Sequence, residues 1–70
     1  MNSYIQQVKE WGIKAQEEET AGNYKEAYNL YLNCIHNFDY MMKHEQNQTI
    51  IKVYKEKLLE YLSRAERVKK

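Results

Sequence analysis

The chain has 70 residues, about half the length of an average domain, so it forms one small domain or part of a longer protein. Eleven basic residues stand against ten acidic ones, which argues against a nucleic-acid-binding protein with its strongly basic face. A single cysteine excludes a disulfide framework and fits a reducing compartment, and no apolar run approaches the ~18 residues of a membrane span. With no proline and only two glycines, the chain is expected to be helical, soluble and intracellular.

Two polar breaks divide the chain into three helical segments. At the first break, Gly22 is suited to end one helix and Asn23 to begin the next, and Glu26 completes a capping-box pattern three positions later. At the second break, Asn47 and Thr49 are the candidate caps. The pattern predicts helices over residues 3–19, 24–45 and 49–69.

The hydrophobic periodicity predicts how these helices pack. Connections this short force neighbouring helices to run antiparallel, so the expected fold is an all-α, up-down-up three-helix bundle that forms a single domain over residues 1–70. The apolar residues of the middle helix spread over an arc of roughly 160°, wider than the stripes of the outer helices. A helix that is apolar over such a width contacts two neighbours, so we expect the middle helix to pack against both others.

Residues that could carry chemistry are few. His36 and His44 lie eight positions apart on one helix and project on different sides, so we expect solvated histidines and no metal site. Cys34 lies at the edge of the apolar arc and is interpreted as a small core residue, since no partner base is visible. The acidic run 17–19 is interpreted as a solvated helix end. We therefore expect no catalytic, cofactor-binding or metal-ligating residue in this chain.

The more informative feature is a set of apolar residues that miss the core stripe. On the third helix, Leu59 and Leu62 project outward in the same sector as Lys55 and Glu66. Leucines three positions apart, flanked by a base and an acid, suit a surface on which a partner helix docks. Singly exposed leucines are also ordinary, so both interpretations stay open at this point. Ile13, opposite the core face of the first helix, is a weaker feature of the same kind.

Two stretches of the sequence resemble a known family. Residues 21–27 (AGNYKEA), followed by Leu30 and Tyr31, resemble the junction between helices one and two of MIT (microtubule-interacting and trafficking) domains. Residues 60–69 (EYLSRAERVK) resemble the end of the third helix in the same family. The likeness is closest to the N-terminal domain of the vacuolar protein sorting AAA ATPases that act on ESCRT-III, and it covers nearly the whole chain. Because tetratricopeptide repeats share the spacing of the first stretch, a scaffold fragment of that kind is the alternative.

The resemblance implies two docking sites for short C-terminal motifs of ESCRT-III subunits. Family members bind a leucine-rich amphipathic helix between helices two and three, and an extended, proline-containing peptide between helices one and three. Leu62 matches the family's key apolar contact and Glu66 an acidic position suited to the motif's arginines. The expected residues of the first site are Leu62, Glu66, Leu59, Lys55, Met42 and Asp39. The candidates for the second groove are Ile13, Glu60 and Arg64.

The resemblance also implies a role for the domain. We expect an adaptor that recruits a AAA ATPase to ESCRT-III for its disassembly in endosomal sorting and membrane scission. Such an adaptor is cytoplasmic, is recruited to endosomal membranes without inserting into them, and is monomeric when isolated. The chain has no Walker motif, so no cofactor is expected here, and ATP and Mg belong to a downstream motor region. An MIT domain of a microtubule-severing ATPase or of another trafficking adaptor is the further alternative.

Overall fold

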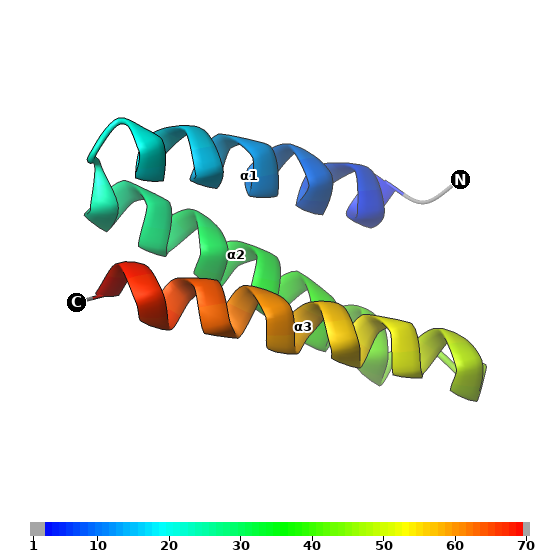
Figure 1. Cartoon of the computed structure of the whole chain (residues 1–70). Coiled ribbons are helices and arrows are strands. Elements are labelled where there is room, and N and C mark those ends of the chain that lie inside the picture. The colour runs from blue at the N-terminus through cyan, green and yellow to red at the C-terminus, as the bar shows by residue number, and fades with distance from the viewer. Residues whose placement is uncertain (1–2, 70) are drawn as a thin grey trace.

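The computed structural model describes residues 3–69, which form three helices. Helix α1 spans Ser3–Thr20, α2 spans Tyr24–Lys43 and α3 spans Gln48–Lys69. The three run antiparallel to one another in an up-down-up bundle (Figure 1), which confirms the predicted fold. The predicted bounds differ most at the end of α2, which stops two residues before the expected residue 45. None of the described helices combines the length and the apolar character that crossing a membrane requires.

The turn between α1 and α2 depends on Gly22. This glycine has a φ of 87°, a left-handed conformation that residues with a Cβ rarely adopt. Its N–H donates to the carbonyl of Glu19 at 3.1 Å, and the N–H of Asn23 donates to the carbonyl of Glu18 at 2.8 Å. This pair of bonds is a Schellman motif, which satisfies the free carbonyls at the end of α1. The prediction that Gly22 ends the first helix is confirmed.

The capping box predicted at the start of α2 is wrong. Asn23 is the N-terminal cap residue, but its side chain makes no capping hydrogen bond with the backbone of α2. Instead, Asn23 Nδ2 donates to Glu18 Oε1 at 2.7 Å. The Schellman turn brings Asn23 next to this carboxylate, and a charged acceptor forms a stronger hydrogen bond than a neutral one. The side chain of Asn23 therefore stabilises the turn from the α1 side.

Asn47 starts α3. Its Oδ1 accepts hydrogen bonds from the N–H groups of Thr49, at 2.9 Å, and Ile50, at 3.3 Å. These are the second and third residues of the helix, the positions that a capping side chain serves. Of the two candidate caps, Asn47 is the one used, and α3 begins one residue earlier than predicted, at Gln48.

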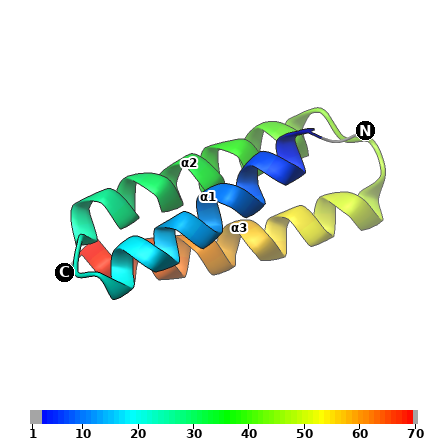
Figure 2. The ribbon, with the colours of Figure 1, turned by 90° about the horizontal axis from the view of Figure 1, so that it is seen from above.

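Helix α2 is the central element of the bundle. It packs along both α1 and α3, whereas the backbones of α1 and α3 approach each other at few points. Viewed from above, α1 runs obliquely over the layer that α2 and α3 form (Figure 2). The buried residues of α2 accordingly cover a wide arc of its surface, as predicted: Ala27, Leu30, Tyr31, Cys34, Phe38 and Met41.

Four aromatic rings form a column inside the bundle. Tyr31 of α2 is fully buried, and its ring centroid lies 6.1 Å from that of Tyr61 on α3. Phe38, two turns further along α2, lies 5.8 Å from Tyr61 and 6.0 Å from Tyr54. Aromatic pairs at these separations add to the stabilisation that burial alone provides. The column joins the two halves of the core along the seam between α2 and α3.

One carboxylate links all three helices at one end of the bundle. Glu19, in the last turn of α1, accepts a hydrogen bond from the hydroxyl of Tyr31 on α2 at 2.9 Å. It also accepts one from Arg67 Nε on α3 at 3.1 Å. Because the backbones of α1 and α3 approach each other at few points, this link helps to hold the end of α1 over the other two helices.

The single cysteine is part of the core, as predicted. Cys34 is fully buried, and its thiol donates a weak hydrogen bond to the carbonyl of Val8 at 3.6 Å. Burial raises the pKa of the Cys34 thiol from its ordinary value of 9.0 to about 11. His36 and His44 are exposed, also as predicted. No group of three potential metal ligands occurs among the described residues.

The first prediction concerns the Glu19 link. Glu19→Ala leaves the buried hydroxyl of Tyr31 without its acceptor and should lower the free energy of unfolding by about 1–3 kcal/mol. Tyr31→Phe removes donor and bond together and should cost less, about 0.5–1.5 kcal/mol. Because the two changes remove the same bond, the double variant should lose less than their sum, as measured by urea unfolding followed by circular dichroism. Strict additivity would show that the bond contributes nothing.

The second prediction concerns alkaline pH. The unfolded chain releases the Cys34 proton from about pH 9, whereas the folded chain holds it to about pH 11, so stability falls as the pH rises through this range. The raised pKa of Tyr31, caused by burial and then by its bond to Glu19, adds a further loss above pH 10. The Cys34 share amounts to roughly 2–3 kcal/mol. Urea midpoints measured at a series of pH values should show the fall, and Cys34→Ala should flatten its lower part.

Candidate functional site

The seam between α2 and α3 opens into a surface hollow at one end of the bundle. The hollow has a volume of about 260 Å³ and is lined by Tyr24, Lys25 and Tyr28 from α2 and by Val68 and Lys69 from α3. Residues seven positions apart on a helix lie on nearly the same side of it. Leu62 and Lys55 therefore lie on the side of α3 that carries Lys69. We name this seam the α2–α3 groove.

The α2 wall of this groove follows from the same spacing. Ile35 and Met42 lie seven and fourteen positions after Tyr28, and both are half-buried and packed against the core. Asp39 lies between them, exposed, and its carboxylate pairs with Lys43 at 3.1 Å. Tyr28 and Ile35 are not among the predicted site residues, although their place at the edge of the wide apolar arc marks them as residues with one exposed side.

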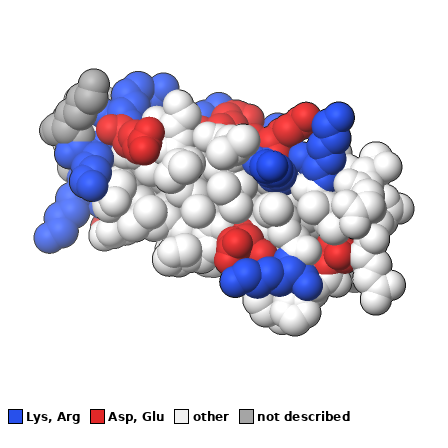
Figure 3. Space-filling model, turned by 90° about the horizontal axis from the view of Figure 1, so that it is seen from below, with Lys and Arg blue, Asp and Glu red and all other residues white. Residues whose placement is uncertain are grey.

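The α3 wall carries the predicted strip. Leu62 is 39% exposed and Leu59 is 52% exposed. Glu66 and Lys55 are exposed, and within the described residues neither takes part in an ion pair. The face seen from below is uncharged over most of its middle, with charged side chains along its margins (Figure 3). None of the six predicted residues is in the lining of the hollow itself. Helix periodicity places Lys55 and Leu62 on the side of α3 that carries Lys69, and Met42 on the side of α2 that carries Tyr28.

A second hollow lies between α1 and α3. It has a volume of about 230 Å³, and Ile5, Val8 and Lys9 of α1 face Val53 and Lys57 of α3 across it. Its remaining lining residues are Phe38, Tyr54 and Tyr61. We name it the α1–α3 hollow.

The three predicted second-groove residues do not line this hollow. Glu60 and Arg64 contact residues that line it. Glu60 pairs with Lys57 at 3.7 Å, and the Arg64 guanidinium lies 5.5 Å from the centre of the Tyr61 ring. Glu60 also accepts a hydrogen bond from Arg64 at 2.7 Å. Ile13, 60% exposed, lies outside the lining.

The lining residue that the sequence analysis missed most clearly is Val53. Its side chain is 48% exposed, and, like Leu59, it lies off the core stripe of the third helix. That departure from the core periodicity is the signal that could have identified it. The α1–α3 hollow is thus framed by an exposed valine and two lysines, Lys9 and Lys57.

Tyr61 closes the inner end of the α1–α3 hollow by resting on Gly12. A Cβ at Gly12 would lie 2.6 Å from the Tyr61 hydroxyl oxygen and 3.3 Å from Cζ, so only glycine leaves room for this ring. Burial raises the pKa of Tyr61, and the neighbouring Cys34 raises it further, while Arg64 acts against both. Because Gly12 has no side chain, the Tyr61 ring can take the position in which it lines this hollow.

Comparison with known proteins bears on this arrangement of grooves. The model of the MIT (microtubule interacting and transport) domain matches residues 5–70. The chain belongs to the MIT domain family. It is 35% identical over 68 residues to the Arabidopsis thaliana protein SUPPRESSOR OF K(+) TRANSPORT GROWTH DEFECT 1, covering 97% of this chain and 16% of that protein. It is 34% identical over 67 residues to the Dictyostelium discoideum vacuolar protein sorting-associated protein 4, covering 96% of this chain and 15% of that protein.

These findings confirm the resemblance drawn from residues 21–31 and 60–69. The MIT match over nearly the whole chain, together with three helices that pack as one bundle, leaves no support for a tetratricopeptide fragment. The chain spans about one sixth of the length of these two relatives, so it corresponds to one small part of proteins of their kind.

A third prediction tests the contact that shapes the α1–α3 hollow. Gly12→Ala should gain about 1 kcal/mol of helix propensity but lose about 1–3 kcal/mol through overpacking against Tyr61, a net destabilisation. In a Tyr61→Phe background the closest clash is gone, so the same change should be neutral or stabilising. Urea unfolding of the four proteins measures this difference. An equal effect of Gly12→Ala in both backgrounds would contradict the described contact.

Proposed function

We propose that this domain is an adaptor that binds C-terminal motifs of ESCRT-III subunits and brings a AAA ATPase to them in endosomal sorting and membrane scission. The family match and the vacuolar protein sorting relative support this assignment. The domain itself catalyses nothing and holds no cofactor, and ATP and Mg act in another region of the parent protein. The adaptor works in the cytoplasm and reaches endosomal membranes through its partner.

The observation that carries the proposal is the exposed leucine strip beside the half-buried residues of α2. An amphipathic helix laid in the α2–α3 groove covers Leu62 on one side and Ile35 and Met42 on the other. Burying one leucine fully contributes about 1.5–3 kcal/mol. The exposed carboxylate of Glu66 suits an arginine of the motif, because an arginine and a carboxylate can form two parallel hydrogen bonds. The leucines supply affinity, and Glu66 sets the register.

The α1–α3 hollow supports a second binding mode in the same role. It is narrow and apolar and lies between two helices whose backbones approach each other at few points, which suits an extended, proline-containing peptide better than a helix. Lys9 and Lys57 at its sides favour a peptide with acidic residues next to the apolar ones. Both modes bury little surface, so each binds a single motif weakly, and several domains in one oligomeric ATPase act by avidity.

A fourth prediction tests the α2–α3 groove. Leu62→Asp puts a charge where the partner's leucines pack, so it should weaken binding of a leucine- and arginine-rich helical peptide at least tenfold. Ile13→Asp is the matched control, since Ile13 is an equally aliphatic exposed residue away from this groove. Fluorescence anisotropy of the labelled peptide measures both affinities, and circular dichroism should show unchanged helicity. Normal binding by Leu62→Asp would rule out this groove.

Amide chemical shifts of the labelled domain distinguish the two binding modes. The helical peptide should shift Leu59, Leu62 and Glu66, whereas an extended, proline-containing peptide should shift residues of the α1–α3 hollow such as Lys9, Val53 and Lys57. If neither peptide changed the amide chemical shifts, this would contradict ESCRT-III binding. The microtubule-severing ATPases and other trafficking adaptors would then remain as the parent proteins of this domain.

A further inference from the structure

A third docking surface lies on the opposite side of α2 from the α2–α3 groove. Between α1 and α2 the surface is hollowed over about 410 Å³, and the hollow is lined by Trp11, Asn33, His36, Asn37 and Tyr40. Trp11 is half-buried, so one part of the indole packs on the core while another faces this hollow. The lining is aromatic and amide-rich and carries no fixed charge. None of these residues belongs to the proposed ESCRT-III sites.

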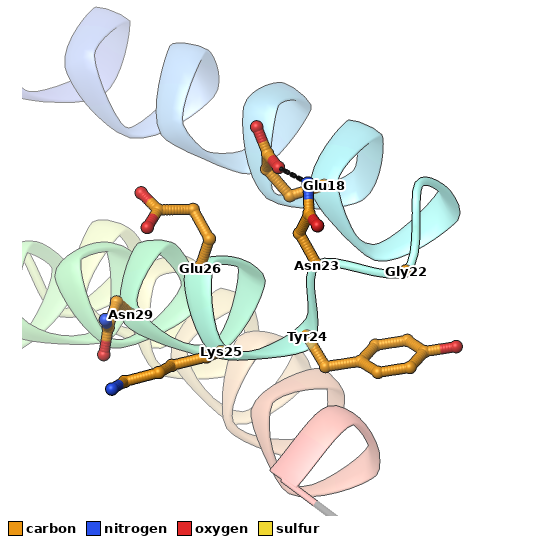
Figure 4. Close-up of a pocket in the computed structure, with 7 residues that line it drawn as sticks. All are labelled: Glu18, Gly22, Asn23, Tyr24, Lys25, Glu26 and Asn29. Carbon is orange, nitrogen blue, oxygen red and sulfur yellow. Dashed lines mark hydrogen bonds between the residues drawn. The ribbon is translucent and has the colours of Figure 1, made fainter.

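An open notch lies at the end of the same seam, beside the α1–α2 turn. Its lining includes two carboxylates, Glu18 of α1 and Glu26 of α2. Lys25 also lines the notch, although in Figure 4 its side chain extends on the opposite side of α2 from the Glu26 carboxylate, while the Glu18 carboxylate lies over α1 beside Asn23. Glu18 already accepts a hydrogen bond from Asn23 at Oε1, and its position is therefore held.

The hollow and the notch belong to one furrow. Glu18 lies seven positions after Trp11 on α1, and Glu26 lies seven positions before Asn33 on α2, so each pair shares one side of its helix. Seven residues of helix rise about 10 Å. The furrow between α1 and α2 thus has an acidic end and, about 10 Å away, an aromatic and amide-lined centre.

We propose that this furrow binds an extended peptide that carries a basic residue and, three positions away, a proline. Charge complementarity favours the basic residue, because the lining of the notch holds two carboxylates, Glu18 and Glu26, against one lysine, Lys25. A proline ring packs on the faces of Trp11 and Tyr40, and the amide groups of Asn33 and Asn37 hydrogen-bond the backbone of an extended peptide. Three extended residues span about 10 Å, which matches the distance between the two ends.

The single tryptophan makes this surface directly measurable. Trp11 is the one tryptophan of the chain and lines the hollow, so its emission reports on the furrow. The probes are two capped peptides, Gly-Ser-Arg-Ala-Ala-Pro-Ala-Gly and its reversed sequence, which contain no aromatic residue. One of them should change the Trp11 emission saturably and protect Trp11 from acrylamide quenching. The same peptide with glutamate in place of arginine should lose the effect.

Matched variants locate the binding. Glu26→Gln removes one of the two carboxylates that line the notch and should weaken the arginine peptide about two- to tenfold. Glu56→Gln, an exposed glutamate on α3, is the control and should change nothing. Leu62→Asp should leave this titration unaffected while it abolishes binding of the helical peptide, so this inference and the proposed function fail independently.

Two outcomes overturn the proposal. Unchanged Trp11 emission and quenching with both peptides up to about 5 mM would show that the furrow holds no such peptide, since even weak docking is detected at that concentration. Equal changes in Trp11 emission with the arginine and the glutamate peptide would show that the carboxylates do not select a basic residue. Equal effects of Glu26→Gln and Glu56→Gln on peptide affinity would show the same.

Discussion

The structure depends on one constraint, the burial of the wide apolar arc of α2 against both other helices, whose backbones approach each other at few points. The column of rings that Tyr31, Phe38 and Tyr61 help to form fills the space where three helices meet. Gly12 gives Tyr61 room from the α1 side, and Glu19 ties the far end of α1 to both other helices. Because α2 serves both neighbours, each seam of the bundle is left partly open at the surface.

The three seams differ in the charged residues along them, and this difference is the basis on which we propose a distinct partner for each. Exposed Glu66 lies along the α2–α3 groove, and Lys9 and Lys57 frame the α1–α3 hollow. Two carboxylates, Glu18 and Glu26, and one lysine, Lys25, line the notch between α1 and α2. A bundle of this size buries too little to enclose a cavity, so its binding sites are necessarily shallow seams. Selectivity then depends on the charges at their margins, and strength on how many copies act together.

The two turns show where local sequence is enough and where it is not. Gly22 was predicted correctly and Asn47 was one of two candidate caps, because a left-handed residue and a helix cap act within a few positions along the chain. The capping role of Asn23 failed, although its sequence pattern was right, because the turn places its amide beside the carboxylate of Glu18. A choice between two hydrogen-bond partners depends on distances that the pattern does not contain.

By itself the sequence determined three helices, their antiparallel order, the two-sided packing of α2 and the outward position of Leu59 and Leu62, since all of these follow from periodicity and short connections. Its resemblance to MIT domains, which the comparisons confirm, indicated the family. Only the tertiary structure decided which residues face each other across a seam: that Val53 meets α1, that Ile13 stands apart from the hollow, and that Trp11 opens onto a third furrow. Periodicity locates a residue on its own helix, whereas a groove depends on the crossing of two helices.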